Sequence, residues 1–227
     1  MSAPGIHVIE PVPFRLDRKD VLRLLGYGPR ARSPAPRVQE ILDGWLRESE
    51  ELIESRGAYA FGEPGRIQGP AAFRGAELVA FGVCTIGARL TERVTELAAR
   101  GETLRAMILD AIGSSAVESA TDVVNAAICE SIARRRMIAG RRISPGYAAW
   151  AIEGQKEIFS LLPWHVTGVT LKPSGFMEPR KSVSFAVSAG RNIRHSKVVS
   201  ICAYCSLRRC RYRRQPRSSQ QSRPHAG

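Results

Sequence analysis

The sequence predicts an α+β protein whose first half is rich in helices and whose second half is rich in strands. Two long stretches with helical apolar spacing lie in the first half, at residues 38–53 and 103–137. Two stretches of alternating, β-branched residues lie in the second half, at residues 166–171 and 182–188. The chain has 227 residues, 44% hydrophobic and 24% charged, which is typical of a soluble globular protein with a sizeable core.

The N-terminal elements are predicted to be short. An apolar alternation at residues 7–9 is followed by two prolines, and it predicts an edge strand because proline cannot donate to a central ladder. Asp17 is a candidate N-cap for a helix that ends at Leu25, before two glycines. Residues 30–36 are a Pro-rich link.

The middle of the first half alternates between helices, a loop and a strand. Residues 38–53 have apolar and acidic residues on opposite faces and predict an amphipathic helix. Residues 57–74, rich in Gly and Pro, are expected to form a loop. The compact apolar run at 78–83 predicts a buried strand, and a helix that ends at Gly101 is expected after it.

Residues 103–137 predict the longest helix. Its small residues at 113–116 allow close approach of another helix or of a ligand. Glu118 and Asp122 lie four residues apart on one face, and they repel each other unless a cation or a donor lies between them. A solvated acidic face explains the two carboxylates equally well.

Residues 142–147, Arg-Ile-Ser-Pro-Gly-Tyr, are predicted to form a loop because Pro145-Gly146 is a turn dipeptide. The Arg142 guanidinium and the Tyr147 phenol flank this tight backbone. Such a loop suits a ligand with a carboxylate for the arginine and a flat ring for the backbone edge. A short helix over residues 152–162 is expected next, and then the strands at 166–171 and 182–188, as antiparallel neighbours.

Two segments, in this order, resemble the S-adenosylmethionine-binding activation domain of cobalamin-dependent methionine synthase. Residues 142–147 resemble its Arg-x-x-x-Gly-Tyr signature. Leu171-Lys-Pro-Ser-Gly-Phe-Met-Glu-Pro-Arg-Lys-Ser-Val-Ser184 resembles its Leu-Thr-x-Ser-x-x-Met-x-Pro-x-x-Ser-Val-Ser segment, with Lys172-Pro173 in place of the usual Thr-Glu. The resemblance is strongest over residues 110–184, and the family's early Asp has no counterpart here. It implies a twisted antiparallel sheet with flanking helices.

The resemblance also implies a ligand and its contacts. The ligand is S-adenosylmethionine, and the predicted contacts are Glu118, Arg142, Ser144, Gly146 and Tyr147. Arg142 would hold the carboxylate bidentately, and Glu118, with Asp122 as second choice, would take the ammonium group. Backbone groups of Ser144 and Tyr147 would read the adenine edge. A salt bridge between Arg142 and Glu118 is the structural alternative.

The implied task is reductive reactivation of cob(II)alamin, with S-adenosylmethionine as the methyl donor. The chain has no Asp-x-His-x-x-Gly corrinoid motif, and its length leaves no room for homocysteine, folate or cobalamin domains. The resemblance therefore implies an accessory component of methionine synthase activity without a catalytic residue of its own. Its expected partners are an electron donor and a corrinoid protein or methionine synthase that lacks an activation domain.

Three of the five cysteines, Cys202, Cys205 and Cys210, have a spacing that suits three ligands of zinc or of an iron–sulfur cluster. His195, Cys129 or an external group would be the fourth ligand, and three unligated thiols in a frayed tail are the equally weighted alternative. An odd number of cysteines argues against a disulfide framework. We expect an activation-like domain over residues 1–200, a Cys-rich motif over 201–212 and a basic disordered tail over 213–227.

The net charge of +13 is concentrated near the C-terminus. The last 20 positions contain no acidic residue and seven arginines: Arg208, Arg209, Arg211, Arg213, Arg214, Arg217 and Arg223. We interpret them as a solvated tail. A metal- or nucleic-acid-binding module is the alternative function, disfavoured because basic residues are not interleaved with aromatics and no complete zinc-finger spacing exists. A relative that kept the fold and lost the ligand is a third possibility.

No apolar run approaches the roughly 20 residues needed to span a bilayer. The N-terminus also lacks the basic and apolar regions of a secretory signal. A cytoplasmic location is therefore expected.

Overall fold

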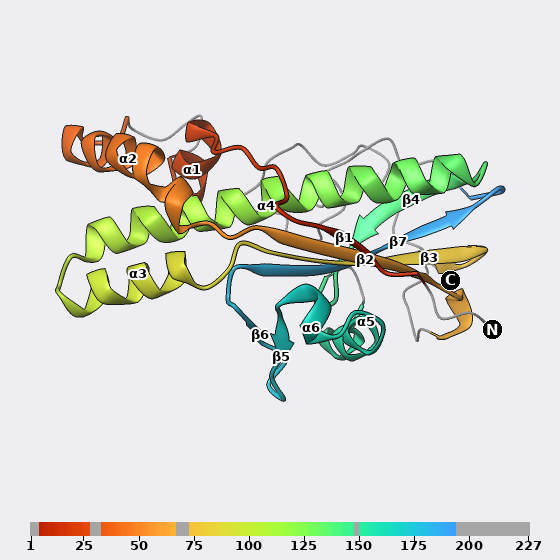
Figure 1. Cartoon of the computed structure of the whole chain (residues 1–227). Coiled ribbons are helices and arrows are strands. Elements are labelled where there is room, and N and C mark those ends of the chain that lie inside the picture. Colours follow the sequence, from red (N-terminus) through yellow and green to blue (C-terminus); the bar gives the residue numbers. More distant parts are fainter. Residues whose placement is uncertain (1–4, 28–32, 67–72, 148–149, 194–227) are drawn as a thin grey trace, which may run out of the picture.

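A five-stranded antiparallel sheet forms the centre of the fold, with helices on both of its faces (Figure 1). The computed structural model describes residues 5–27, 33–66, 73–147 and 150–193. The strand order is β1-β2-β3-β7-β4. The strands are β1 (His7–Ile9), β2 (Arg56–Gly62), β3 (Leu78–Thr85), β4 (Ile138–Ile143) and β7 (Ser182–Gly190).

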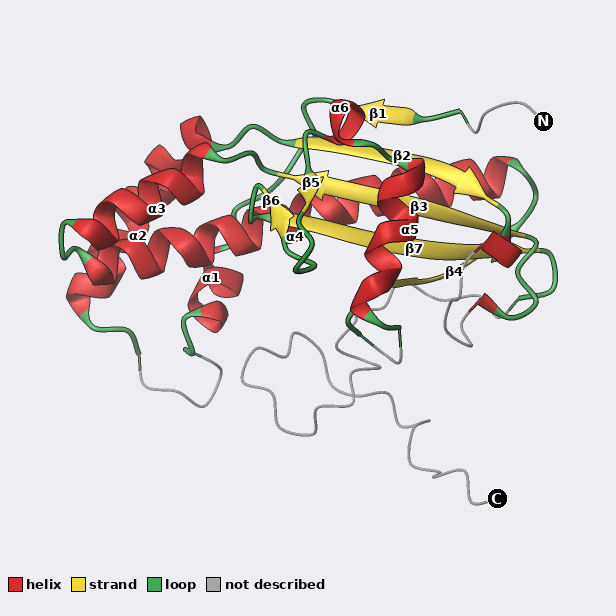
Figure 2. Cartoon of the chain, turned by 90° about the horizontal axis from the view of Figure 1, so that it is seen from below, coloured by secondary structure: helices red, strands yellow, loops and turns green. Residues whose placement is uncertain are grey.

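The 32-residue helix α4 (Thr103–Arg134) is about 48 Å long at roughly 1.5 Å per residue, and it extends well past the sheet. Its C-terminal half covers one face of the sheet (Figure 1). Its N-terminal half packs with three helices beyond the strand ends (Figure 2). These are α1 (Arg18–Leu24), α2 (Pro36–Glu48) and α3 (Arg89–Ala99).

The opposite face of the sheet is covered by short elements (Figure 2). They are α5 (Gln155–Leu161), α6 (Trp164–Thr167) and the two-stranded hairpin of β5 (Thr170–Leu171) and β6 (Met177–Glu178). Three short 3-10 turns complete the described elements: Ser49–Leu52, Pro64–Arg66 and Ile152–Gly154.

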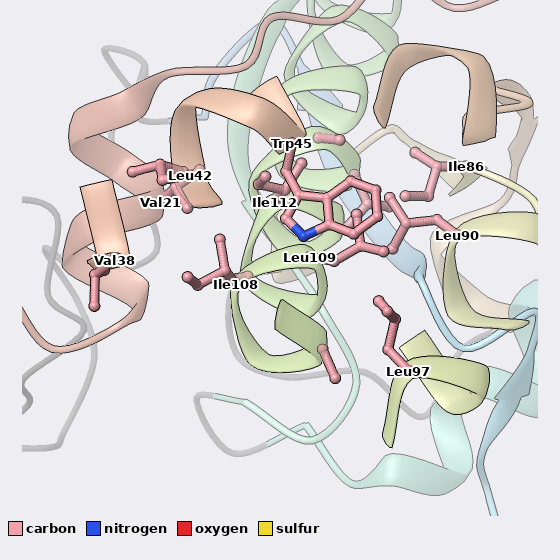
Figure 3. Packing of buried hydrophobic residues seen from close by; sticks show 14 residues of the cluster. Val21, Val38, Leu42, Trp45, Ile86, Leu90, Leu97, Ile108, Leu109 and Ile112 are labelled. Carbon is pink, nitrogen blue, oxygen red and sulfur yellow. The ribbon is translucent and has the colours of Figure 1, made fainter. Parts of the chain in front are cut away.

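Three clusters of buried side chains hold these layers together. One joins α1, α2, α3 and α4, and Figure 3 shows its Trp45 indole among Leu90, Leu109 and Ile112. The other two lie on the two faces of the sheet. Because β3 is buried on both faces, its apolar run is nearly continuous. Phe81 and Val83 face α5 and α6, whereas Cys84 faces α4.

The structure confirms the α+β class and several of the predicted elements. β1 is an edge strand, as the prolines after it indicate. Asp17 caps α1, since its side chain accepts hydrogen bonds from the N–H groups of Lys19 and Asp20. The small run in α4 serves helix packing, because a Cβ added at Gly113 would lie 2.6 Å from the Leu90 side chain of α3.

The prediction of a loop over residues 57–74 is wrong for its first part, because β2 occupies Arg56–Gly62. Glycine there is a packing feature rather than a turn signal. A Cβ added at Gly57 would lie 2.4 Å from Cγ2 of Val124 on α4, so only glycine lets the helix approach the strand so closely. Residues 67–72 lie outside the described part.

The strand predicted at 166–171 is also largely wrong. Val166 and Thr167 belong to α6, and their N–H groups donate to the Pro163 carbonyl. Gly168, with φ of 69°, ends that helix in the left-handed conformation. The β5 strand that remains pairs with β6 rather than with β7, because β3 and β4 already occupy both edges of β7.

The loop predicted over residues 142–147 is wrong at its start. Arg142 and Ile143 are the last residues of β4 and pair with Val187 and Ala186 of β7. The turn begins only at Ser144, because the pairing with β7 overrides the turn signal that follows.

Among the helices that the structure describes, none is long and apolar enough to cross a membrane. The domain expected over residues 1–200 is described up to residue 193. The Cys-rich motif of 201–212 and the tail of 213–227 lie outside the described residues, so these boundaries remain predictions.

We expect Gly82→Ala to destabilise the fold by about 1–3 kcal/mol, the usual cost of overpacking a core. A Cβ at Gly82 would lie 2.4 Å from Cζ of Phe185, whose fully buried ring has no room to move. Urea unfolding followed by circular dichroism measures the change in free energy.

Gly44→Ala is the matched control for that measurement. Gly44 lies within α2, and nothing is within 4 Å of the position of an added Cβ. This variant should gain about 0.5–1 kcal/mol from the lower backbone entropy of the unfolded chain. Equal unfolding midpoints for Gly82→Ala and wild type would contradict the packing described for Phe185.

Candidate functional site

The candidate site consists of Arg142 on β4 and of Glu118 and Asp122 on α4 (Figure 1 shows the two elements). After α4 ends, a turn with Arg136 at φ of 55° reverses the chain into β4. From that turn, about 13–17 helical residues at ~1.5 Å each cover roughly 20–25 Å back to the two carboxylates. About seven extended residues at ~3.3 Å each cover the same distance to Arg142. The different rises of helix and strand therefore bring these residues together.

Arg142 contacts both carboxylates. Its Nη2 donates a hydrogen bond of 3.3 Å to Oε2 of Glu118. Its Nη1 lies 3.0 Å from Oδ1 of Asp122, an ion pair that is not aligned as a hydrogen bond. Nη1 is buried and has no hydrogen-bond acceptor among the described residues. The guanidinium thus retains an unused donor although it faces two anions.

The Phe185 ring of β7 packs against the guanidinium of Arg142. The Cζ atom of Arg142 lies 5.6 Å from the centre of the Phe185 ring, within the range of a cation–π contact. The Arg142 side chain is 18% exposed, whereas those of Glu118 and Asp122 are 42% and 61% exposed. The cation is therefore fixed in a half-buried position, and the two carboxylates face solvent around it.

The position of Arg142 resolves the repulsion expected between Glu118 and Asp122. A cation does lie between the two carboxylates, which is one of the two alternatives that their spacing on α4 left open. The salt bridge that the sequence left as the structural alternative is present. It does not exclude a ligand, because a carboxylate and an ammonium group could replace the two partners one for one.

Cys84 lies in the core beneath this cluster, and it is a thiol that stays protonated. Burial raises the pKa of Cys84 to about 12, although a hydrogen bond with Thr121 and the charge of Arg142 act in the opposite direction. Glu118 raises this pKa further. Cys84 therefore adds no charge to the site at neutral pH and serves as a small apolar residue under α4.

The loop after Arg142 folds on itself. Gly146 has φ of 85° and donates its N–H to the Trp150 carbonyl at 2.8 Å. Tyr147 donates its N–H to the Ser144 carbonyl at 3.2 Å. These two amides are thus already used within the loop. The Ser144 carbonyl accepts from Tyr147 and the Tyr147 carbonyl accepts from the Trp150 N–H at 3.0 Å, so each of these carbonyls keeps one lone pair for a further donor. The Tyr147 side chain is 54% exposed.

Trp150 anchors this loop to the other face of the sheet. Its ring is 3% exposed and meets Phe73 edge to face, with ring centres 5.4 Å apart. Gly154 makes room for it, since a Cβ there would lie 2.2 Å from Nε1 of Trp150. The loop therefore has a fixed base close to an exposed end at Gly146 and Tyr147.

The second segment of the resemblance, residues 171–184, serves mainly to join parts of the fold. Nζ of Lys181 lies 2.8 Å from both Oδ1 of Asp110 and Oγ of Ser114, which ties the start of β7 to α4. Lys172, at a position where the family has Thr, forms an ion pair with Glu178. Residues 171–175 line a cavity of about 110 Å³ together with Ile152, Glu153, Gln155 and Lys156. This volume is well below the roughly 300 Å³ of a small ligand pocket.

Two features of the site were not predicted from the sequence. Phe185 was assigned only to a strand, and its contact with Arg142 depends on the pairing of β4 with β7. Asp122 was the second choice for a single role, yet it shares Arg142 with Glu118. The i, i+4 spacing of the two carboxylates is the sequence signal that relates them.

The predicted metal site is not tested. Cys202, Cys205, Cys210 and His195 lie outside the described residues. Within the described ranges, no group of three or more His, Cys, Asp or Glu side chains could hold a metal ion. Cys129, the other candidate ligand, lies on α4, where burial raises the pKa of its thiol.

Comparison with known proteins gives a match in structure but none in sequence. No family model and no curated protein matches the chain. The chain is similar to the crystal structure of the MetH reactivation domain bound to AdoHcy, with a TM-score of 0.62 and 14% sequence identity. The match covers 85% of this chain and 80% of that chain. The chain therefore has the fold of the MetH reactivation domain, as the resemblance over residues 110–184 predicts.

Proposed function

We propose that this chain binds S-adenosylmethionine at the Arg142 cluster and supports the remethylation of cob(II)alamin on a partner protein. The observation that carries the proposal is the meeting of Arg142 and Glu118. They are 24 residues apart and lie 3.3 Å from each other, in a fold whose solved counterpart is bound to AdoHcy, S-adenosylhomocysteine. One cation and one anion at this spacing match the amino-acid end of that ligand.

Each charge of the site has a counterpart on the ligand. The planar guanidinium of Arg142 can hold a carboxylate through two donors, and its Nη1 has no hydrogen-bond acceptor among the described residues. Glu118 would exchange Arg142 for the ammonium group of the ligand. Because the guanidinium is fixed over Phe185, little side-chain entropy is lost on binding.

The loop from Ser144 to Tyr147 would hold the adenine end. It begins two residues after Arg142, and the carbonyls of Ser144 and Tyr147 each keep one lone pair beside the hydrogen bond that they accept within the loop. The exocyclic amine of adenine is a donor that fits such carbonyls. The exposed Tyr147 ring offers a flat face nearby.

Reactivation would need an electron donor in addition to S-adenosylmethionine. The electron would reduce cob(II)alamin on the partner, and the methyl group of S-adenosylmethionine would then pass to the reduced cobalt, leaving S-adenosylhomocysteine. The partner would be a corrinoid protein or a methionine synthase without its own activation domain. The role of this chain is to bind the methyl donor and present it.

We expect Arg142→Ala to weaken S-adenosylmethionine binding by about 2–4 kcal/mol, the range for breaking a desolvated charge pair. Arg142→Lys should recover only part of this loss, because an ammonium lacks the two-pronged donor geometry. Isothermal titration calorimetry measures both effects.

Arg134→Ala is the matched control for the arginine variants. Arg134 forms an exposed i, i+4 ion pair with Glu130 at 2.8 Å, at the far end of α4. Its removal should leave the affinity unchanged. If Arg142→Ala binds S-adenosylmethionine as tightly as wild type does, the site assignment is wrong.

Function is tested with a partner. Added to a cob(II)alamin-bearing protein with S-adenosylmethionine and a low-potential reductant, the chain should speed the return to methylcobalamin, followed in the visible spectrum. Glu118→Gln should slow that return without unfolding the protein, since it removes charge at nearly constant volume. Donor binding without acceleration, across several corrinoid proteins of the same cell, would refute the reactivation role.

The cysteine spacing supports a metal or cluster as an additional proposal. We expect anaerobically purified protein to contain roughly one zinc ion or iron–sulfur cluster per chain. Replacing Cys202 and Cys205 with serine should abolish it, whereas Cys129→Ser should retain it unless Cys129 is the fourth ligand. Elemental analysis that finds neither zinc nor iron in the wild-type chain would argue against this site.

A further inference from the structure

We infer that Asp122 makes the site prefer the sulfonium ligand, S-adenosylmethionine, over the neutral thioether, S-adenosylhomocysteine. The inference rests on the proposed function and concerns the same site. Its basis is that the cluster of Arg142, Glu118 and Asp122 holds one more negative than positive charge. Arg142 is the one cation, and Glu118 and Asp122 are both within 3.3 Å of it.

The two ligands differ by one charge next to identical amino-acid ends. Both carry a carboxylate and an ammonium group, which cancel each other. S-adenosylmethionine has a sulfonium in addition and is therefore a monocation. When the ligand carboxylate takes Arg142 and its ammonium takes Glu118, Asp122 loses its only cation partner among the described residues. The sulfonium is the charge that would neutralise it.

Contact geometry indicates that the contact of Asp122 with Arg142 is more readily exchanged than that of Glu118. The Glu118 contact is a hydrogen bond, whereas the Asp122 contact is an ion pair without alignment. Asp122 is also the more exposed of the two, with 61% of its side chain accessible against 42% for Glu118. An exposed, unaligned pair contributes little and is readily exchanged.

Three neighbouring ionisable groups, Cys84, Asp110 and Glu130, add no uncompensated negative charge to the cluster. Cys84 stays protonated because burial raises its pKa to about 12. Asp110, two turns before Glu118 on α4, is compensated by Lys181 at 2.8 Å. Glu130, two turns after Asp122, is compensated by Arg134. Of these acidic residues on α4, Asp122 is therefore the one that would be left without its cation partner, Arg142, when the ligand binds.

The experiment compares the affinities of the two ligands by isothermal titration calorimetry in wild type, Asp122→Asn and Glu130→Gln. Wild type should bind S-adenosylmethionine about tenfold more tightly than S-adenosylhomocysteine, a difference of about 1.4 kcal/mol. Asp122→Asn should bring the two affinities to within about twofold. Glu130→Gln removes the same charge from the same helix and should keep the tenfold ratio.

The preference should also weaken with salt. Asp122 is exposed, so a rise from 0.1 M to 1 M NaCl, which shortens the Debye length from about 10 Å to about 3 Å, should reduce the wild-type ratio. The ratio in Asp122→Asn should stay constant. Contacts that the two ligands share cancel in the ratio of their affinities. A change that weakens both ligands equally would therefore leave this ratio, and its dependence on salt, unchanged.

The outcomes separate this inference from the proposed function. If wild type binds both ligands with equal affinity, or Asp122→Asn keeps the wild-type ratio, Asp122 does not discriminate and the inference is wrong, while the binding function stands. If wild type binds neither ligand, the proposed function itself fails. Loss of the ratio in Glu130→Gln as well would assign the preference to the overall charge of the helix and would overturn the role of Asp122.

Discussion

Helix α4 lies close to the sheet because small residues separate them, and the rest of the structure depends on this contact. Gly57 leaves room for Val124, and Cys84 and Ala120 fill the space beside it. At Gly82 the missing side chain is replaced by the ring of Phe185 from the neighbouring strand. A bulkier residue at any of these positions would lift the helix and with it the two carboxylates that it carries.

The packing of α4 on the sheet also determines which side chains surround Arg142. Phe185 fills the gap over Gly82 and also forms the floor under the guanidinium, so the packing of the core and the position of the cation share one ring. Glu118 and Asp122 reach Arg142 only because α4 runs back over β4 after a tight turn. The half-buried cation and its more exposed anions form a cluster that ligand charges could enter at low cost in reorganisation.

The two segments of the family resemblance have different structural roles. Residues 142–147 carry the cation and an exposed loop end, which are features of a binding site. Residues 171–184 form a hairpin and the start of β7, and Lys181 joins them to α4. A motif can therefore identify a fold through residues that hold the fold together, and only part of this motif belongs to the proposed site.

The sequence by itself determined the elements whose signals are local. Helical spacing, the Asp17 cap and the apolar run of β3 predicted most of the helices and the buried strand. The i, i+4 spacing of Glu118 and Asp122 left a bridging cation and a solvated acidic face as alternatives. The tertiary structure alone decided the rest, because strand pairing and layer packing act between residues distant in sequence. In the tertiary structure Gly57 belongs to β2, the β-branched Val166 belongs to α6, and β4 extends through Arg142. Burial of the sheet on both faces and the free edge of β7 outweigh the local propensities of these residues.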